Sequence, residues 1–200
     1  MKENLSPKVK ALYEAVLELI AENVDVRDVK VSDITSRAGI GKGTAYEYFS
    51  NKEELIGSAL LYHIDLICSH VMSDIREMED FSEVIQYLLV CMDREISKRD
   101  CLIQFIQMVT DNGPISRLLR DKIKNNSQIC MPQELIDQVL QIGIRQGKIS
   151  SRFQFSYMRL AVMSKILMYA FYITMEQSAE VCDRQQMHQL LCEGLLRELG

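Results

Sequence analysis

The chain has 200 residues, 48% of them hydrophobic and 26% charged, and a formal net charge of −5 at pH 7. This balance is typical of a globular protein with a sizeable core and excludes a collagen-like or disordered chain. The net negative charge argues against general binding of polyanions, so any nucleic-acid binding needs a local basic surface.

The first predicted helix begins at Ser6-Pro7 and runs to about residue 23. Ser6 has the side chain of an N-cap, and Pro7 is tolerated at the first helical position, where its missing N–H would be unpaired. The segment before Ser6 is polar and lacks the apolar core of a signal peptide, so we expect a cytoplasmic protein. Helical spacing predicts a buried stripe of Val9, Leu12, Val16, Leu19 and Ile20.

The next stretch, Lys30 to Leu55, predicts two short helices joined by a sharp turn. Ser32–Ala38 forms the first helix, and Gly39 supplies the left-handed backbone that ends it. The second helix begins at Gly41 or Lys42 and presents hydroxyl groups and a lysine. This arrangement is typical of a helix-turn-helix, which reads double-stranded DNA.

A long helix follows, and its first turn has capping-box spacing either at Ser50 and Glu53 or at Asn51 and Glu54. We expect it to reach about Glu79. Its inward side chains are predicted to be Leu55, Ala59, Tyr62, Leu66 and Ile67. We place a domain boundary inside this helix, with a DNA-binding domain at 1–52 and a helical domain at 53–200.

The rest of the chain also predicts helices. Asp80 can cap one that runs to about residue 98, and Pro114 and Pro132 look like first-turn prolines. The other helices are predicted at 100–112, from Pro132 to near Gly147, at 154–176 and at 183–199. Strand signals are absent, and three Pro and nine Gly suit a helical chain, so the expected fold is all-α with about nine helices.

The helix-turn-helix stretch resembles the TetR-type bacterial transcriptional regulators. The resemblance covers roughly residues 8–60, and Lys30, Gly41 and Ala45 depart from the residues usual in the family. Lys30 and Gly41 stand where Thr or Ser commonly caps a helix. The matching residues are Asp33-Ile34, Ala38-Gly39-Ile40, Lys42-Gly43-Thr44, Tyr46-Glu47-Tyr48-Phe49 and Asn51-Lys52-Glu53-Glu54-Leu55.

The resemblance implies DNA contacts by the helix-turn-helix. Lys42 can reach a guanine or a phosphate, and Lys52 lies where a helix N-terminus favours an anion. Alternatives stay open: Thr44 can bond to its own helix, Tyr46 can be a packing aromatic and Lys52 a solvated lysine. The segment 30–52 has four basic and two acidic residues, a local net charge of +2. The candidate DNA-binding residues are Ser32, Arg37, Lys42, Gly43, Thr44, Tyr46, Tyr48 and Lys52.

For the C-terminal domain, the resemblance implies a small-molecule pocket among the middle helices and a dimer built by the last two helices as a four-helix bundle. At helical spacing the same apolar residues are also consistent with plain core. The candidate ligand-binding residues are His70, Tyr87, Phe105, Met108, Met168 and Phe171. The candidate dimer residues are Met158, Val162, Tyr169, Leu190, Leu191 and Leu195.

Catalytic and metal motifs are absent from the sequence. Gly41-Lys42 is followed by Gly43, not by the Ser or Thr of a phosphate loop, and no strand precedes it. The six cysteines show no zinc spacing, and we expect them to be small buried hydrophobes. We therefore predict no enzyme, no metal and no cofactor. The polar stripe of His63, His70 and Asp74 is either structural or a ligand contact.

The sequence thus favours a homodimeric repressor that an unknown small-molecule effector releases from a near-palindromic operator, with no membrane partner. An alternative is a DNA-binding protein of the same fold without a small ligand, controlled by a protein partner or by thiol oxidation. An all-helical enzyme is the third hypothesis, and no catalytic constellation supports it.

Overall fold

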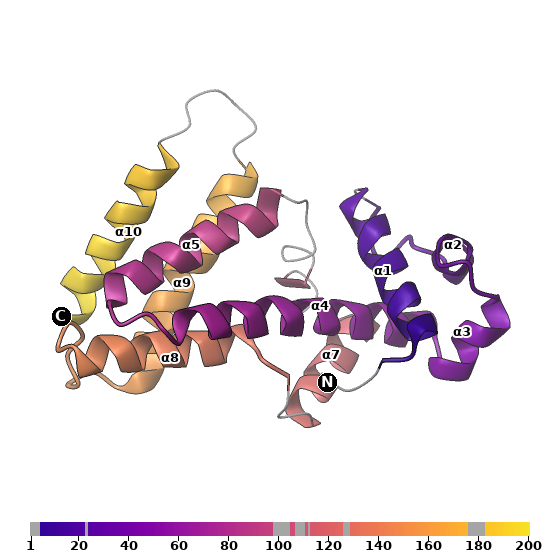
Figure 1. Cartoon of the computed structure of the whole chain (residues 1–200), viewed down its shortest axis with the longest axis horizontal. Coiled ribbons are helices and arrows are strands. Elements are labelled where there is room, and N and C mark those ends of the chain that lie inside the picture. Colours follow the sequence, from indigo (N-terminus) through magenta and orange to yellow (C-terminus); the bar gives the residue numbers. More distant parts are fainter. Residues whose placement is uncertain are drawn as a thin grey trace. The chain divides into compact units, whose positions relative to one another are not determined.

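A computed structural model describes residues 5–22, 24–97, 105–106, 111, 113–125, 129–175 and 183–200. These residues form nine α-helices and no strand (Figure 1), which confirms the all-α prediction. The chain divides into two compact units, Met1–Ile67 with Glu95–Cys130, and Cys68–Arg94 with Met131–Gly200. A functional boundary at residue 52 remains a prediction.

The first unit contains three short helices that contact one another pairwise, α1, α2 and α3. It also contains the start of α4 and all of α7. We refer to residues 5–22 and 24–52 as the head. The helix bounds are Pro7–Ala21 for α1, Val31–Arg37 for α2, Lys42–Tyr48 for α3, Lys52–Ile75 for α4 and Pro114–Asn125 for α7.

Local capping signals place the helices of the head. The Ser6 hydroxyl accepts a hydrogen bond from the Val9 N–H at 3.3 Å, as predicted. Gly39 has φ of +64° between α2 and α3, the left-handed conformation that the turn requires. The cap of α4 follows the second alternative, because Asn51 Oδ1 accepts from the Glu54 N–H at 2.8 Å.

An aromatic contact holds the end of α3 in the head. The ring of Tyr13 on α1 lies 5.8 Å from that of Phe49 and 5.4 Å from that of Tyr62, measured between centroids. Ala45 and Phe49 are both buried, as their shared helix face predicted. The head core is completed by the fully buried Leu12, Ile20 and Ile34.

The second unit contains α5, Phe81–Ser97, up to Arg94, together with α8, Pro132–Arg145, α9, Phe155–Met175, and α10, Arg184–Leu199. Helix α9 contacts both α8 and α10. The predicted stop at Gly147 is confirmed by its φ of +68°. The predicted cap at Asp80 is confirmed as well, since its carboxylate accepts from the N–H groups of Ser82 and Glu83 at 2.8 and 3.1 Å.

Two sequence expectations for α4 need correction. The helix ends at Ile75 rather than at Glu79, and Leu66 is 44% exposed rather than turned inward. Helix α4 is long and apolar enough to span a membrane, but 61% of its apolar window is buried inside the chain, as in the core helix of a globular protein. The helix predicted at 100–112 lies mostly outside the described residues; residues 105–106 are helical.

Candidate nucleic-acid interface

Helix α3 buries one residue, half-buries a second and exposes the other five. Ala45 is 2% exposed and anchors the helix, whereas Tyr46 and Tyr48 are 49% and 42% exposed. Lys42 and Gly43 are exposed and Thr44 is half-buried. A seven-residue helix is too short to be stable alone, so packing of Ala45 and the following Phe49 has to hold it in place.

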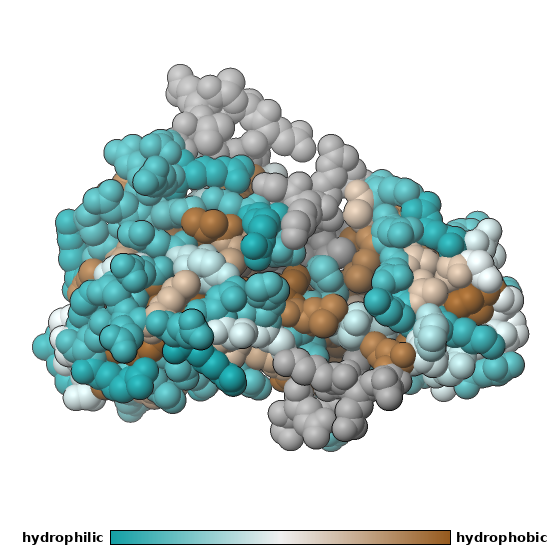
Figure 2. Space-filling model, viewed as in Figure 1, coloured by the Kyte–Doolittle hydropathy of each residue, from teal (hydrophilic) through white to brown (hydrophobic). Residues whose placement is uncertain are grey.

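The exposed surface of α3 has the chemistry that duplex DNA requires. A lysine, a hydroxyl and two phenols can donate hydrogen bonds to phosphates and base edges. No atom lies within 4 Å of the position that a Cβ on Gly43 would take, so the α3 backbone there is open to a close partner. Figure 2 shows hydrophilic and pale residues over α2 and α3 on the visible face, with a hydrophobic patch among them.

Lys52 anchors the loop that precedes α2. Its ammonium donates to the carbonyl of Arg27 at 2.9 Å, and it lies at the first position of α4. Since an ammonium has three N–H donors, this bond leaves donors for a phosphate. Lys52 thus holds the loop before α2 in place, a contact that the sequence did not reveal. Its remaining N–H groups can still donate to a phosphate.

Arg37 and Ser32 are engaged within the head. The Arg37 guanidinium forms two hydrogen bonds with the Glu22 carboxylate, at 2.7 and 2.8 Å, and Glu18 lies 3.6 Å away. The Arg37 guanidinium holds the pKa of Glu22 below its usual range. Ser32 is exposed and donates to Asp33 at 3.4 Å. Arg37 therefore fastens α2 to α1, and its phosphate contact stays a prediction.

The candidate ligand residues do not gather in one place. In the second unit, His70 Nδ1 lies 3.1 Å from Asp74 Oδ2, and Tyr87 donates to the same carboxylate. Burial and this bond raise the pKa of Tyr87. Phe105 is buried in the first unit, Phe171 is 56% exposed, and Met108 lies outside the described residues.

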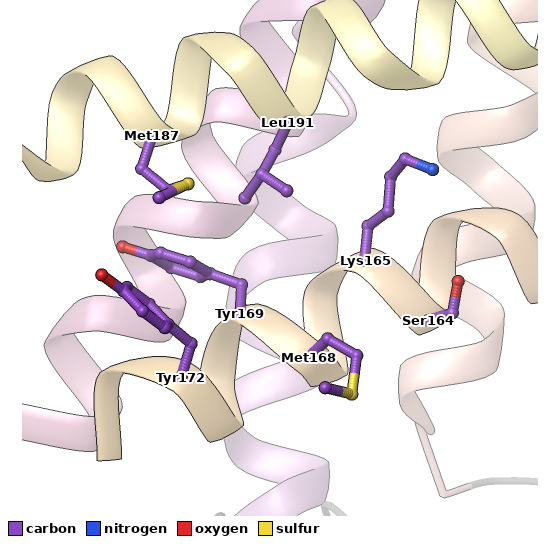
Figure 3. A pocket seen from close by; sticks show the side chains of 7 residues that line it. All are labelled: Ser164, Lys165, Met168, Tyr169, Tyr172, Met187 and Leu191. Carbon is purple, nitrogen blue, oxygen red and sulfur yellow. The ribbon is translucent and has the colours of Figure 1, made fainter. Parts of the chain in front are cut away.

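An open, mainly apolar cavity of about 430 Å³ lies between α9 and α10. Met187 and Leu191 on α10 point toward Tyr169 on α9 (Figure 3). Of the candidate ligand residues that the structure describes, only Met168 lines it. The full lining is Ser164, Lys165, Met168, Tyr169, Tyr172, Met187 and Leu191.

A second cavity, of about 520 Å³, lies in the first unit between α1, α4 and α7. Sequence reasoning missed it, because no local pattern joins residues 13, 58 and 122. We call it the head-base cavity. Its lining is Tyr13, Ser58, Leu61, Leu118, Asp121, Lys122, Asn125 and Ile129.

The candidate dimer residues fall into two groups. Leu190 is 52% exposed and Leu191 is half-buried, so both offer surface to a partner. The others are buried inside the protomer, and their contact with a second copy stays a prediction: Met158, Val162, Tyr169 and Leu195. Exposed apolar side chains of α9 instead form what we call the outer stripe: Leu160, Leu167, Met168 and Phe171.

A polar network explains why Tyr169 is buried. Its hydroxyl donates to Asp93 on α5 at 2.7 Å and lies 2.8 Å from His188 Nε2 on α10. His188 Nε2 is also 3.1 Å from the Asp93 carboxylate. A buried hydroxyl with a carboxylate partner is satisfied, so Tyr169 ties three helices of the second unit together.

Comparison with known proteins also identifies the helix-turn-helix segment. Residues 12–59 match the model of the bacterial regulatory proteins of the tetR family. The fatty acid metabolism regulator protein of Bacillus subtilis is 25% identical over 149 residues, which cover 72% of this chain and 71% of that protein.

Two solved structures share the fold over nearly the whole length. The fatty acid degradation regulator FadR from Bacillus halodurans has a TM-score of 0.74 at 19% identity, covering 97% of each chain. FadR from Bacillus subtilis in complex with stearoyl-CoA has a TM-score of 0.73 at 21% identity, covering 96% of this chain and 99% of that one. The helix-turn-helix segment therefore matches the tetR family of bacterial regulatory proteins, and the chain shares the fold of these two regulators over nearly its whole length.

Proposed function

We propose that the protein is a homodimeric repressor that binds a near-palindromic operator and leaves it when a small-molecule effector binds. The observation that carries this proposal is the set of donors on α3 and at the start of α4, of which Lys42, Tyr46 and Tyr48 are exposed and Thr44 and Lys52 half-buried. Because base contacts specify and phosphate contacts position, we assign Lys42 to a base edge or phosphate and the other four to the backbone.

A dimer supplies the second recognition helix. Two α3 helices would enter successive major grooves about 34–36 Å apart, which requires a fixed pairing of two copies. The outer stripe on α9 and Leu190 on α10 are exposed apolar side chains, 39% to 65% exposed. Apolar surface of this kind on neighbouring helices favours association with a second copy.

The effector would act by binding one conformation of the dimer more tightly than the other. The Bacillus subtilis FadR structure holds stearoyl-CoA, so a fatty acyl thioester is the first effector class to test for this chain. We place the protein in the cytoplasm, where its DNA would be, without a membrane partner.

Control by thiol oxidation is the weaker alternative on structural grounds. Among the described residues, Cys68, Cys91 and Cys192 are buried and Cys130 is half-buried. Burial raises the pKa of Cys192, which lowers its thiolate fraction at neutral pH. A protein partner in place of the effector remains an alternative.

DNA binding is tested by fluorescence anisotropy with the DNA that flanks the protein's own gene. We expect the double variant Tyr46→Phe and Lys52→Gln to weaken binding at least tenfold and to reduce the steep salt dependence that phosphate contacts produce. Arg197→Gln, which removes one exposed charge from α10, is the matched control and should bind as the unmodified protein does. Equal affinities of the double variant and the unmodified protein would refute the assigned interface.

A further inference from the structure

Helix α3 has an outermost line of residues that the assigned phosphate contacts do not use. Successive residues of an α-helix are turned by about 100°, so Gly43 and Glu47 each lie about 160° from the buried Ala45. They are four residues apart and therefore share one face, which we call the central line. By the same geometry, Tyr46 lies on one side of the central line and Thr44 on the other. The hydroxyl groups assigned to phosphates thus flank a centre that has no assigned partner.

Glu47 supplies the side chain of the central line. It is exposed, whereas Gly43, one turn before it, has no side chain. No atom lies within 4 Å of the position that a Cβ on Gly43 would take. A partner can therefore approach the helix backbone at Gly43 closely, and the Glu47 carboxylate then reaches into that partner.

The Glu47 carboxylate is free within the part of the chain that the structure describes. No described residue forms a hydrogen bond or an ion pair with it. Other carboxylates of the head are engaged, since Glu22 pairs with Arg37 at 2.7 Å. Asp25 pairs with Arg27 at 2.8 Å. A free carboxylate at the centre of a surface that faces phosphates weakens binding to every DNA sequence, unless a hydrogen-bond donor of the DNA meets it.

The base edges in the major groove offer such a donor at two of the four bases. These donors are the N4 amino group of cytosine and the N6 amino group of adenine. An ionised carboxylate accepts hydrogen bonds and donates none, so the acceptor edges of guanine and the O4 of thymine repel it. Adenine also carries its N7 acceptor beside the amino group, where it opposes the second carboxylate oxygen. Cytosine has a C–H group at the corresponding place and is therefore the best match.

We propose that Glu47 is a specificity-determining residue, which accepts a hydrogen bond from the N4 amino group of one cytosine in each operator half-site. This inference rests on the proposed function and adds the base that the centre of α3 reads. The carboxylate selects by repulsion as well as by attraction, because it lowers the affinity for half-sites with guanine or thymine at that position.

Selection from a pool of DNA duplexes with a random core, followed by sequencing, tests the assignment without a known operator. The unmodified protein should enrich a near-palindrome with a cytosine in each half-site. Glu47→Ala should lose about tenfold of the discrimination at that position and keep the rest of the motif. Glu47→Gln should shift the preference toward adenine, because a glutamine amide matches its N6 and N7 groups.

A control variant and a folding measurement accompany the selection. Glu14→Gln removes an exposed carboxylate from α1 and should select the same motif as the unmodified protein. Thermal unfolding shows that each variant folds, and Glu47→Gln keeps the shape of the side chain.

Altered DNA tests the hydrogen bond itself. In N4-methylcytosine that is paired with guanine, the methyl group replaces the N–H that faces the major groove. At the selected position it should weaken binding of the unmodified protein about tenfold and leave Glu47→Ala unaffected, as measured by fluorescence anisotropy. Equal binding of the two DNAs by the unmodified protein would overturn the cytosine contact.

The selection also separates this inference from the proposed function. The same motif from the unmodified protein and from Glu47→Ala would overturn the role of Glu47 and leave the proposed function standing. A preference that depends on Glu47 for a base other than cytosine would overturn the assigned base. An unmodified protein that enriches no sequence would overturn the proposed function and this inference together.

Discussion

The head and the α9–α10 pair expose opposite kinds of chemistry. Helix α3 buries Ala45 and exposes a lysine and two tyrosines, whereas α9 exposes Leu160 and Phe171 at 65% and 56%. Phosphates accept hydrogen bonds and carry charge, so they suit the first surface, and a second apolar face suits the other. The two surfaces therefore suit different partners, and we propose a polyanion for α3 and a second copy of the chain for α9.

The largest expected effect comes from placing charge on the apolar surface. Leu160→Glu with Phe171→Glu should dissociate the dimer, because each would bury an unpaired carboxylate at the interface. Affinity for an operator with two half-sites should fall roughly a hundredfold, since the second head loses its high effective concentration. Sedimentation equilibrium and fluorescence anisotropy measure the two effects.

Val90→Glu is the control for this pair. Val90 lies on α5 and is 53% exposed, so it carries a similar apolar exposure outside α9 and α10. The Val90→Glu variant should remain a dimer. Dissociation by Val90→Glu, or a double variant that stays dimeric, would contradict the assignment of the outer stripe.

The second-largest effect, on operator binding, should come from a substitution in the head. Lys42→Gln removes an exposed charge from the first position of α3, and it should weaken operator binding about tenfold or more, because a base contact is worth ~1–3 kcal/mol per site. The dimer should be unaffected. Lys10→Gln, in an exposed pair with Glu14 on α1, tests whether charge loss alone explains the change. A Lys42→Gln variant that binds normally would leave α3 without its assigned base contact.

A smaller effect concerns the stability of the head. Gly39→Ala forces a Cβ into the left-handed conformation at φ of +64°, which should lower the free energy of unfolding by roughly 1 kcal/mol. Gly41→Ala adds the same methyl group at φ of −65°, where the backbone accepts it. Neither Cβ would meet an atom within 4 Å, so the pair isolates the backbone effect in urea denaturation. Equal losses in both variants would exclude backbone strain as the cause.

The smallest effect is a pH dependence that can be compared between the two regions. A hydrogen bond from the Ser50 N–H, followed by Lys122, lowers the pKa of Glu54, and Lys165 with Tyr157 lowers that of Glu198 on α10. A lowered folded-state pKa stabilises the protein above the ordinary value of 4.5, and this stabilisation is lost as pH falls through the folded value.

Glu54→Gln should therefore make the loss of stability on acidification shallower, and Glu198→Gln should do the same in the other unit. Urea denaturation midpoints between about pH 6 and about pH 3 measure both slopes. A slope that neither substitution changes would show that other carboxylates dominate the acid response.

Local signals predicted the parts of the fold that depend on neighbouring residues. Ser6, Gly39, Gly147 and Asp80 act through bonds or backbone angles within a few residues of themselves, and all four were placed correctly. The exposed residues of α3 could be proposed from local sequence too. In a helix of seven residues that buries Ala45, most of the other side chains have to face outward.

Contacts between distant segments were not predictable. Helix α9 has apolar residues all round, so helical spacing could not show that Met158 and Val162, two candidate dimer residues, are buried inside the protomer. Tyr169 joins Asp93 and His188 from two other helices, and Arg37 joins Glu22 from α1. Each of these pairs requires the tertiary fold before it can be recognised.

The single anchor of α3 has a consequence for engineering. Since Ala45 alone is buried in this helix, five neighbouring positions can be exchanged without repacking the interior: Lys42, Gly43, Tyr46, Glu47 and Tyr48. A library restricted to these positions should yield variants that retain the melting temperature of the parent and differ in the promoters they recognise. An isolated peptide of the same seven residues would be unstructured in water, so any transplant has to carry the supporting helices with it.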